Sequence, residues 1–251
     1  MASSPTKPRD ESSGSPEDDA GAFGAYSSPP CFMHELDRDF LGLAPDQEPL
    51  PCPLPQGAEA EWPAVRSWRK AMRSGLIERR LRIASADRTV WTARLAQALD
   101  PLLPRTSGAV IGCYWPFRGE FDARPLLTGL RDRGARLALP VVVAKAQPLQ
   151  FRAWTPDARL IRGVWGIPVP DGDETVQPDV VIAPLVGFDP AGYRLGYGGG
   201  FYDRTIANLP VKPQVIGVGF ALARLATIYP QTHDIPMDVI VTEDGVERRP
   251  A

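Results

Sequence analysis

The sequence predicts an α/β fold in which helices cover both faces of a mainly parallel sheet, a three-layer αβα sandwich. Short apolar runs that suit buried strands alternate along the chain with amphipathic segments that suit helices. A glycine-rich loop near residue 200 joins one of these strands to a helix, which is where α/β folds bind their ligands. Residues 62–251 hold 25 basic and 18 acidic side chains, so this part favours anionic ligands.

The chain divides by composition into a tail and one domain. Residues 1–61 are rich in Pro, Ser, Gly, Asp and Glu and hold 3 basic and 12 acidic side chains, which predicts a disordered tail. Its apolar piece, residues 32–41, could be a weak helix or a docking motif, but a solvated tail or an overlong gene start explains it as well. Residues 62–251 are expected to form a single α/β domain.

Composition also excludes several classes of protein. No apolar run approaches about 18 residues, so we expect no membrane span, and the first thirty residues do not resemble a signal peptide. Cys31, Cys52 and Cys113 are odd in number and widely spaced, with no C-x-x-C pair, and the chain has only two histidines. Neither a disulfide framework nor a zinc site is therefore indicated. A reducing cytoplasm is the expected location.

The first helix is predicted from Ala64 onward and is strongly basic. Arg69 and Arg73 stand one turn apart, so both guanidinium groups can project from the same face. Composition alone leaves three interpretations open: a solvated basic helix, a nucleic-acid patch or a phosphate clamp. A second helix is expected after Ser85 as its N-cap. Its buried side is expected to carry Val90, Trp91, Leu95 and Leu99.

A buried strand over 109–115 leads directly into a loop that carries Glu120 and Asp122. A strand end is where an α/β fold places its ligands, but these carboxylates could also cap the helix expected over 123–133. Further strands are expected over 136–143, 149–154, 214–220 and 238–242.

The glycine loop lies between a strand over 180–186 and a helix that begins at Phe201. Its glycines allow positive φ and close approach to a ligand, while the first N–H groups of the helix favour an anion. Arg194 and Arg204 flank the loop, and Asp203 could hold a magnesium ion against phosphate oxygens. A simple tight turn is the alternative. The sequence matches neither the P-loop nor the dinucleotide fingerprint, whose last glycine is replaced by Phe201.

Residues 192–204, Gly-Tyr-Arg-Leu-Gly-Tyr-Gly-Gly-Gly-Phe-Tyr-Asp-Arg, closely resemble the signature of bacterial 5-formyltetrahydrofolate cyclo-ligases, also called methenyltetrahydrofolate synthetases. The resemblance extends over residues 66–243. It implies a Rossmann-like architecture akin to sugar-phosphate isomerases and CoA transferases. It also implies an ATP- and Mg²⁺-dependent reaction that phosphorylates the formyl oxygen of 5-formyltetrahydrofolate and gives 5,10-methenyltetrahydrofolate, ADP and phosphate.

The resemblance also implies roles for individual residues. Catalytic roles fall to Glu120, Arg194 and Tyr202, and the magnesium ion to Asp203. The expected folate-binding residues are Tyr114, Glu120 and Trp165. The expected nucleotide-binding residues are Arg69, Arg73, Arg194, Gly196, Tyr197, Gly198, Gly199, Gly200, Phe201 and Asp203.

Trp165 would stack on the pteridine ring, although it could also be a local packing anchor. A structural role is favoured for His233, because this chemistry requires no imidazole base.

The chain departs from the family pattern at several positions. Phe201 stands where many members have tyrosine, so a hydroxyl contact to the formyl group would have to come from Tyr202 or Tyr114. Tyr197 and Gly199 replace an arginine and a lysine found in some relatives. Val169 replaces the usual glutamate of a Gly-Ile-Pro-Glu-Pro loop.

The expected partners are ATP and a reduced folate, with or without a polyglutamate chain. We expect a monomer that binds neither membrane nor nucleic acid. The alternatives are a sugar-phosphate isomerase or CoA transferase on the same fold, and a non-catalytic RNA-binding relative. An intact glycine loop with Asp203 beside it favours the enzyme.

Overall fold

The computed structural model describes residues 62–249. The predicted tail, with its apolar piece at 32–41, lies outside these residues, as do residues 250 and 251. The division into tail and domain therefore stays a prediction. No helix within 62–249 has the length and apolar character needed to cross a membrane.

The main helices and strands follow the predicted order. The helices are α2 (Trp62–Leu81), α3 (Ser85–Leu99), α4 (Arg124–Arg131) and α5 (Phe201–Asn208). The strands of the main sheet are β1 (Val110–Gly112), β2 (Arg136–Val141), β3 (Gln150–Trp154), β6 (Val180–Pro184), β9 (Gln214–Val218), β10 (Val239–Thr242) and β11 (Gly245–Arg248).

The seven-stranded sheet is mainly parallel, as predicted. Its order is β11-β10-β9-β6-β1-β2-β3, and only the two edge strands, β11 and β3, run antiparallel to their neighbours. The central strand β6 is buried along almost its whole length, which explains why its sequence is a continuous apolar run rather than an alternating one.

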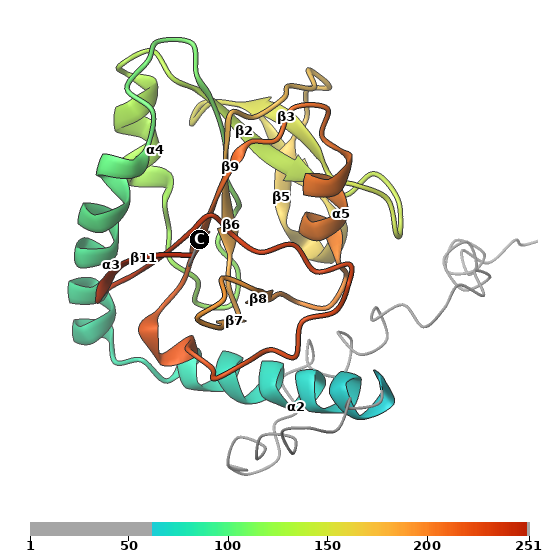
Figure 1. Cartoon of the computed structure of the whole chain (residues 1–251). Coiled ribbons are helices and arrows are strands. Elements are labelled where there is room, and N and C mark those ends of the chain that lie inside the picture. Colours follow the sequence, from blue (N-terminus) through green and yellow to red (C-terminus); the bar gives the residue numbers. More distant parts are fainter. Residues whose placement is uncertain (1–61, 250–251) are drawn as a thin grey trace, which may run out of the picture. The chain divides into compact units, whose positions relative to one another are not determined.

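Helices cover both faces of this sheet (Figure 1). On one face, Leu95 and Leu99 of α3 and Leu127 of α4 pack with strand residues such as Ile182 in one buried cluster. On the other face, Ile206 of α5 packs with Val181 and neighbouring strand residues. Consecutive residues of β6 thus point into opposite clusters, and the predicted three-layer αβα sandwich is confirmed.

The second helix differs from the prediction at its start. The N-cap of α3 is Ala84 rather than Ser85, and no side chain caps it. Val90, expected on the buried side, is 49% exposed, whereas Leu95 and Leu99 are fully buried as predicted. The apolar side of this helix is narrower than its composition suggests, because Val90 lies outside the stripe that faces the sheet.

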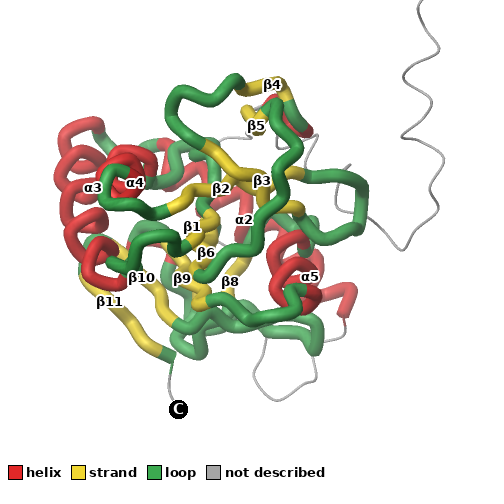
Figure 2. The backbone as a smooth tube through the Cα atoms, turned by 90° about the horizontal axis from the view of Figure 1, so that it is seen from above, coloured by secondary structure: helices red, strands yellow, loops and turns green. Residues whose placement is uncertain are grey.

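Three short features were not predicted. The first is a hairpin of β4 (Leu160–Arg162) and β5 (Pro168–Pro170), with the 3-10 turn η3 (Val164–Gly166) between its strands; Figure 2 shows it beyond the β3 edge of the main sheet. The second is the edge strand β11. The third is a hairpin of β7 (Gly187–Phe188) and β8 (Arg194–Leu195), which leads into the glycine loop. Each strand has two to four residues, too few to show a periodic pattern.

Helix α2 lies across the end of the sheet at which β7 and β8 are found (Figure 1). Its apolar side, including Trp68, Met72 and Leu76, packs with Val186 and Leu195 in a third buried cluster. The basic side chains of α2 are therefore brought to the carboxyl ends of the parallel strands, beside the glycine loop.

Candidate functional site

The hairpin before the glycine loop is held by one buried carboxylate, that of Asp189. Its Oδ1 accepts hydrogen bonds from the backbone N–H groups of Ala191 and Tyr193, both at 3.1 Å. Its Oδ2 accepts a third bond from the N–H of Ile228 at 3.0 Å. Asp189 therefore ties the β7–β8 hairpin to the distant segment around residue 228. Asp189 lies three residues before the signature, and the sequence does not reveal this role.

The glycine loop uses backbone conformations that favour glycine. Gly198 has φ of 97°, and Gly200, the N-cap of α5, has φ of 60°. At Gly199 a Cβ atom would lie 2.6 Å from the ring of Phe201, so this ring covers the loop closely. The N–H groups at the start of α5 carry partial positive charge, which favours an anion at this end of the helix.

Arg194 and Asp203, predicted to bind phosphate and magnesium, lie together as a buried ion pair. Arg194 Nη2 is 3.1 Å from Asp203 Oδ2, and the two side chains are 4% and 13% exposed. Asp203 Oδ1 also accepts the backbone N–H of Ile235 at 3.2 Å.

Two buried polar atoms beside this ion pair, Arg194 Nε and the hydroxyl of Tyr202, have no hydrogen-bond partner within residues 62–249. The Arg194 guanidinium lies 5.3 Å from the centre of the Tyr202 ring. Buried polar groups without partners are rare and call for an explanation. A ligand that arrives at this point with acceptor oxygens is one such explanation.

The two arginines predicted as a pair on the first helix have different surroundings. Arg73 donates from Nε to the carbonyl oxygen of Gly196 at 2.8 Å and so holds the start of the glycine loop. Arg69 bonds instead to the segment after β9: its Nη2 lies 2.6 Å from Asp234 Oδ2, and it donates to the carbonyl oxygens of Ile228 and Tyr229. A phosphate-binding role for either residue stays a prediction.

Glu120 lies in a buried network with two residues from other elements. Its Oε1 accepts the hydroxyl of Tyr197 at 2.7 Å, and its Oε2 accepts the backbone N–H of Phe117 at 2.9 Å. Arg80 Nη1 is 3.9 Å from Oε1. Burial raises the pKa of Glu120 to about 7, although Arg80, Tyr197 and the Phe117 N–H act to lower it. Arg80 was not among the predicted site residues, because the six basic residues of α2 look alike in the sequence.

The remaining carboxylate of this loop, Asp122, points elsewhere. Its Oδ1 accepts the backbone N–H of Arg124 at 3.0 Å at the start of α4, and its carboxylate pairs with the Arg124 side chain. The interpretation of Asp122 as a helix-start residue agrees with this bond, although the N-cap position itself is occupied by Ala123.

The predicted folate-binding aromatics, Trp165 and Tyr114, have different surroundings. Trp165 contacts the glycine loop through Phe201, with ring centres 5.7 Å apart. Its φ of 57° is uncommon for a residue other than glycine, and such strain collects at ligand sites. Tyr114, by contrast, belongs to the core, and its hydroxyl donates to the carbonyl of Phe121 at 2.7 Å.

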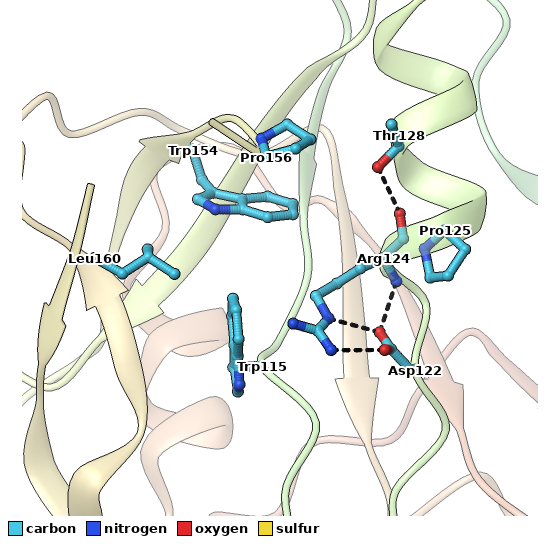
Figure 3. A pocket seen from close by; sticks show the side chains of 8 residues that line it. All are labelled: Trp115, Asp122, Arg124, Pro125, Thr128, Trp154, Pro156 and Leu160. Atoms are coloured by element: carbon cyan, nitrogen blue, oxygen red, sulfur yellow. Dashed lines mark hydrogen bonds and ion pairs between the residues drawn. The ribbon is translucent and has the colours of Figure 1, made fainter. Parts of the chain in front are cut away.

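A separate pocket of about 330 Å³ lies between α4 and the β3–β4 segment (Figure 3). None of the predicted site residues lines it. Its charged groups satisfy each other: Arg124 pairs with Asp122 and also lies 4.1 Å from the centre of the Trp115 ring. The pocket is therefore a poorer candidate for an anionic ligand than the glycine loop.

A magnesium ion fits this site only together with a phosphate ligand. Residues 62–249 contain no group of three or more His, Cys, Asp or Glu side chains that could hold a metal ion. Mg²⁺, however, commonly uses one or two carboxylates together with phosphate oxygens and water. The single carboxylate of Asp203 fits an ion that arrives with a phosphate ligand.

His233 lies at the surface, with its side chain 65% exposed and its Nε2 3.9 Å from Asp234 Oδ1. The role of His233 stays a prediction.

Comparisons with known proteins point to one family. A family profile described as the 5-formyltetrahydrofolate cyclo-ligase family matches residues 65–243. The cyclo-ligase of Escherichia coli K12 is 35% identical over 150 residues, covering 57% of this chain and 82% of that protein. The cyclo-ligase of Mycolicibacterium smegmatis is 32% identical over 180 residues, covering 68% and 91%.

Solved structures show the same likeness. The NMR structure of Aquifex aeolicus 5,10-methenyltetrahydrofolate synthetase matches with a TM-score of 0.62 and 31% identity, covering 72% of this chain and 92% of that one. The synthetase of Mycoplasma pneumoniae, with a TM-score of 0.58 and 20% identity, shares the fold.

Proposed function

Because this chain belongs to the 5-formyltetrahydrofolate cyclo-ligase family, we propose that it converts 5-formyltetrahydrofolate to 5,10-methenyltetrahydrofolate and consumes one ATP per turnover. The observation that carries the proposal is a set of buried contacts at one end of the sheet. It joins the glycine loop, suited to phosphate, to Glu120, the carboxylate predicted to face the folate.

The reaction has a clear physical difficulty. A formamide oxygen is a poor leaving group, so the 10-nitrogen of the folate cannot displace it unaided. Transfer of the γ-phosphoryl group to that oxygen solves this problem: the 10-nitrogen then attacks the activated carbon, and phosphate leaves with the oxygen and the proton of the 10-nitrogen. The protein has to position the two substrates and stabilise the charge on the phosphoryl group in transfer.

We assign the phosphates to the N–H groups of the glycine loop and to Arg194. Gly198 and Gly200 adopt positive φ and bend the loop into the start of α5, where N–H groups favour an anion. The unpartnered Nε of Arg194 supports a contact with phosphate oxygens at this point. Arg73 serves the same site by fixing the Gly196 carbonyl. Each charge-assisted bond contributes about 1.5–3 kcal/mol, so losing one lowers activity by roughly one to two powers of ten.

The Arg194–Asp203 pair is the second part of the proposal. The two side chains neutralise each other. An incoming phosphate competes with Asp203 for the guanidinium, and the Asp203 carboxylate then becomes available to a cation. Bound there, Mg²⁺ supplies neutralising charge for the phosphate oxygens.

The folate is assigned to the opposite side of the loop. The Glu120 carboxylate can accept N–H groups of the pteridine, since each of its oxygens uses only one acceptor position in the described contacts. Trp165, held in a strained conformation beside Phe201, is assigned to stack on the ring. The free hydroxyl of Tyr202 is the candidate for the formyl oxygen, which Phe201 cannot contact through hydrogen bonding.

The test is the rise of the methenyltetrahydrofolate absorbance when full-length protein meets 5-formyltetrahydrofolate and ATP, with Mg²⁺ or with EDTA. We expect a signal that needs both ATP and Mg²⁺. A well-folded protein that gives no signal under any of these conditions contradicts the proposal, and sugar phosphates, CoA esters and RNA are then the ligands to try. Size-exclusion chromatography and cell fractionation test the expected monomer and its cytoplasmic location.

A further inference from the structure

Three side chains from separate parts of the chain form a buried row beside the glycine loop. Arg80 of α2 donates from Nη2 to the hydroxyl oxygen of Tyr197 at 2.7 Å. That hydroxyl in turn donates its proton to Glu120 Oε1, also at 2.7 Å. The Arg80 and Glu120 side chains are only 6% and 4% exposed, so water contributes little to the row.

Arg80 is fixed at the far end of this row by backbone groups. Its Nε donates to the carbonyl of Arg118 at 3.0 Å, and its Nη1 donates to the carbonyl of Leu185 at 3.1 Å. The ring of Phe117 packs against that of Tyr197, with centres 5.8 Å apart. The Tyr197 hydroxyl therefore has one well-determined position, with an acceptor on one side and a donor on the other.

We propose that Tyr197 is a positioning residue for Glu120: its hydroxyl, oriented by Arg80, keeps the carboxylate ionised and aimed at the folate. The inference rests on the proposed function, because it assigns Glu120 to the folate. The position of Tyr197 within the glycine loop means that one residue joins the nucleotide side of the site to the folate side.

The groups that face Glu120 explain why its ionised form needs the hydrogen bond from Tyr197. Arg80 of α2 favours the ionised form, and so do the hydrogen bonds from Tyr197 and the Phe117 N–H. Tyr114, after β1, and Tyr202, in α5, stay neutral because burial and Glu120 raise their pKa values. Burial opposes ionisation and raises the pKa of Glu120 to about 7. Loss of one hydrogen bond therefore changes the fraction ionised at neutral pH.

The chemistry of the ligand explains why the ionised form is required. The pteridine ring of a reduced folate presents N–H donors, and an ionised carboxylate accepts on both oxygens, whereas a protonated one loses part of that capacity. Protonation of Glu120 is thus expected to weaken folate binding and to produce the acid limb of the kcat/KM profile.

The test compares kcat/KM for 5-formyltetrahydrofolate from pH 5.5 to 9 in wild type, Tyr197→Phe and Arg80→Lys. A hydrogen bond to a charged group contributes about 1.5 kcal/mol, or about one pKa unit. The acid limb of Tyr197→Phe should therefore move up by about one unit, with a roughly tenfold loss at pH 6 and nearly wild-type activity at pH 9. Arg80→Lys, which cannot keep all three bonds, should move it in the same direction.

A second readout does not depend on activity. Thermal unfolding of both proteins is measured against pH. The stability of the wild type falls as pH rises and stops falling near the pKa of Glu120 in the folded protein; in Tyr197→Phe the fall should continue about one pH unit higher. Introducing Glu120→Gln into both proteins should remove the difference. Tyr193→Phe is the matched control, because the Tyr193 hydroxyl bonds to no group within residues 62–249.

The outcomes distinguish a failure of the Tyr197–Glu120 coupling from a failure of the proposed function. An equal loss of activity at every pH, with an unchanged unfolding profile, makes Tyr197 a purely structural residue and overturns the proposal. An unfolding profile shifted as expected in a protein without cyclo-ligase activity supports the Tyr197–Glu120 coupling and contradicts the proposed function instead.

Discussion

Arg194 and Asp203 face each other across the glycine loop, with both Nη atoms of the arginine within 3.3 Å of the carboxylate. Breaking a buried pair on one side typically costs about 3–5 kcal/mol. We therefore expect Asp203→Asn to lower the melting temperature and to lower kcat/KM roughly 100-fold or more, since the proposed magnesium contact is lost as well. Asp157→Asn, whose carboxylate is 85% exposed, is the control. Unchanged ATP and Mg²⁺ dependence in Asp203→Asn would contradict the assignment.

The contact between Arg69 and Asp234 gives a second prediction. Asp234→Ala leaves the Arg69 guanidinium buried without its counter-charge, so the free energy of unfolding should fall by about 3–5 kcal/mol. Glu174→Ala, which removes the partner of Arg136 in an exposed pair, should cost about 1 kcal/mol or less. Chemical denaturation measures both.

Arg69→Lys separates anchoring from phosphate binding at the same position. A lysine keeps the charge but not the set of bonds to Ile228, Tyr229 and Asp234, so we expect a lower melting temperature. An unchanged melting temperature with a raised KM for ATP would instead favour the phosphate clamp.

The stability of the protein should depend on the protonation of Glu120. Its pKa is raised in the folded protein from 4.5 to about 7, so the folded state binds a proton between these values that the unfolded state does not. Stability therefore falls as pH rises from 4.5 to 7, by up to about 3 kcal/mol. The Glu120→Gln variant should not show this fall in stability between pH 4.5 and 7. Thermal unfolding of both proteins at several pH values tests this. Parallel curves for the two proteins would contradict the assignment.

Gly199→Ala should disturb the loop through the ring of Phe201. The new Cβ would meet that ring at 2.6 Å and displace it from Trp165, so both the tryptophan fluorescence and kcat/KM should change. Gly172→Ala is the matched control, because nothing lies within 4 Å of its Cβ position. Equal behaviour of the two variants would show that the loop tolerates the methyl group.

The sequence predicted the fold well because the central strands stand out as short apolar runs and the helices as amphipathic segments between them. The order of strands in the sheet was not predicted, since pairing depends on contacts between distant segments. For the site, the glycine loop and Asp203 share one continuous motif. Arg80 became visible only in the structure, because its partners Leu185 and Tyr197 are more than 100 residues away. The bond from the Ile228 N–H to Asp189 was not predicted either, because it joins two loop segments 39 residues apart.

The three N–H groups held by Asp189 also bear on how tightly a nucleotide can bind. Ordering a backbone residue costs about 1–2 kcal/mol of conformational entropy. Because Asp189 fixes the segment before the glycine loop and the segment around residue 228 in the folded protein, this entropy is lost when the chain folds. Less of the interaction energy with ATP is then spent on ordering the protein, and more of it appears as affinity.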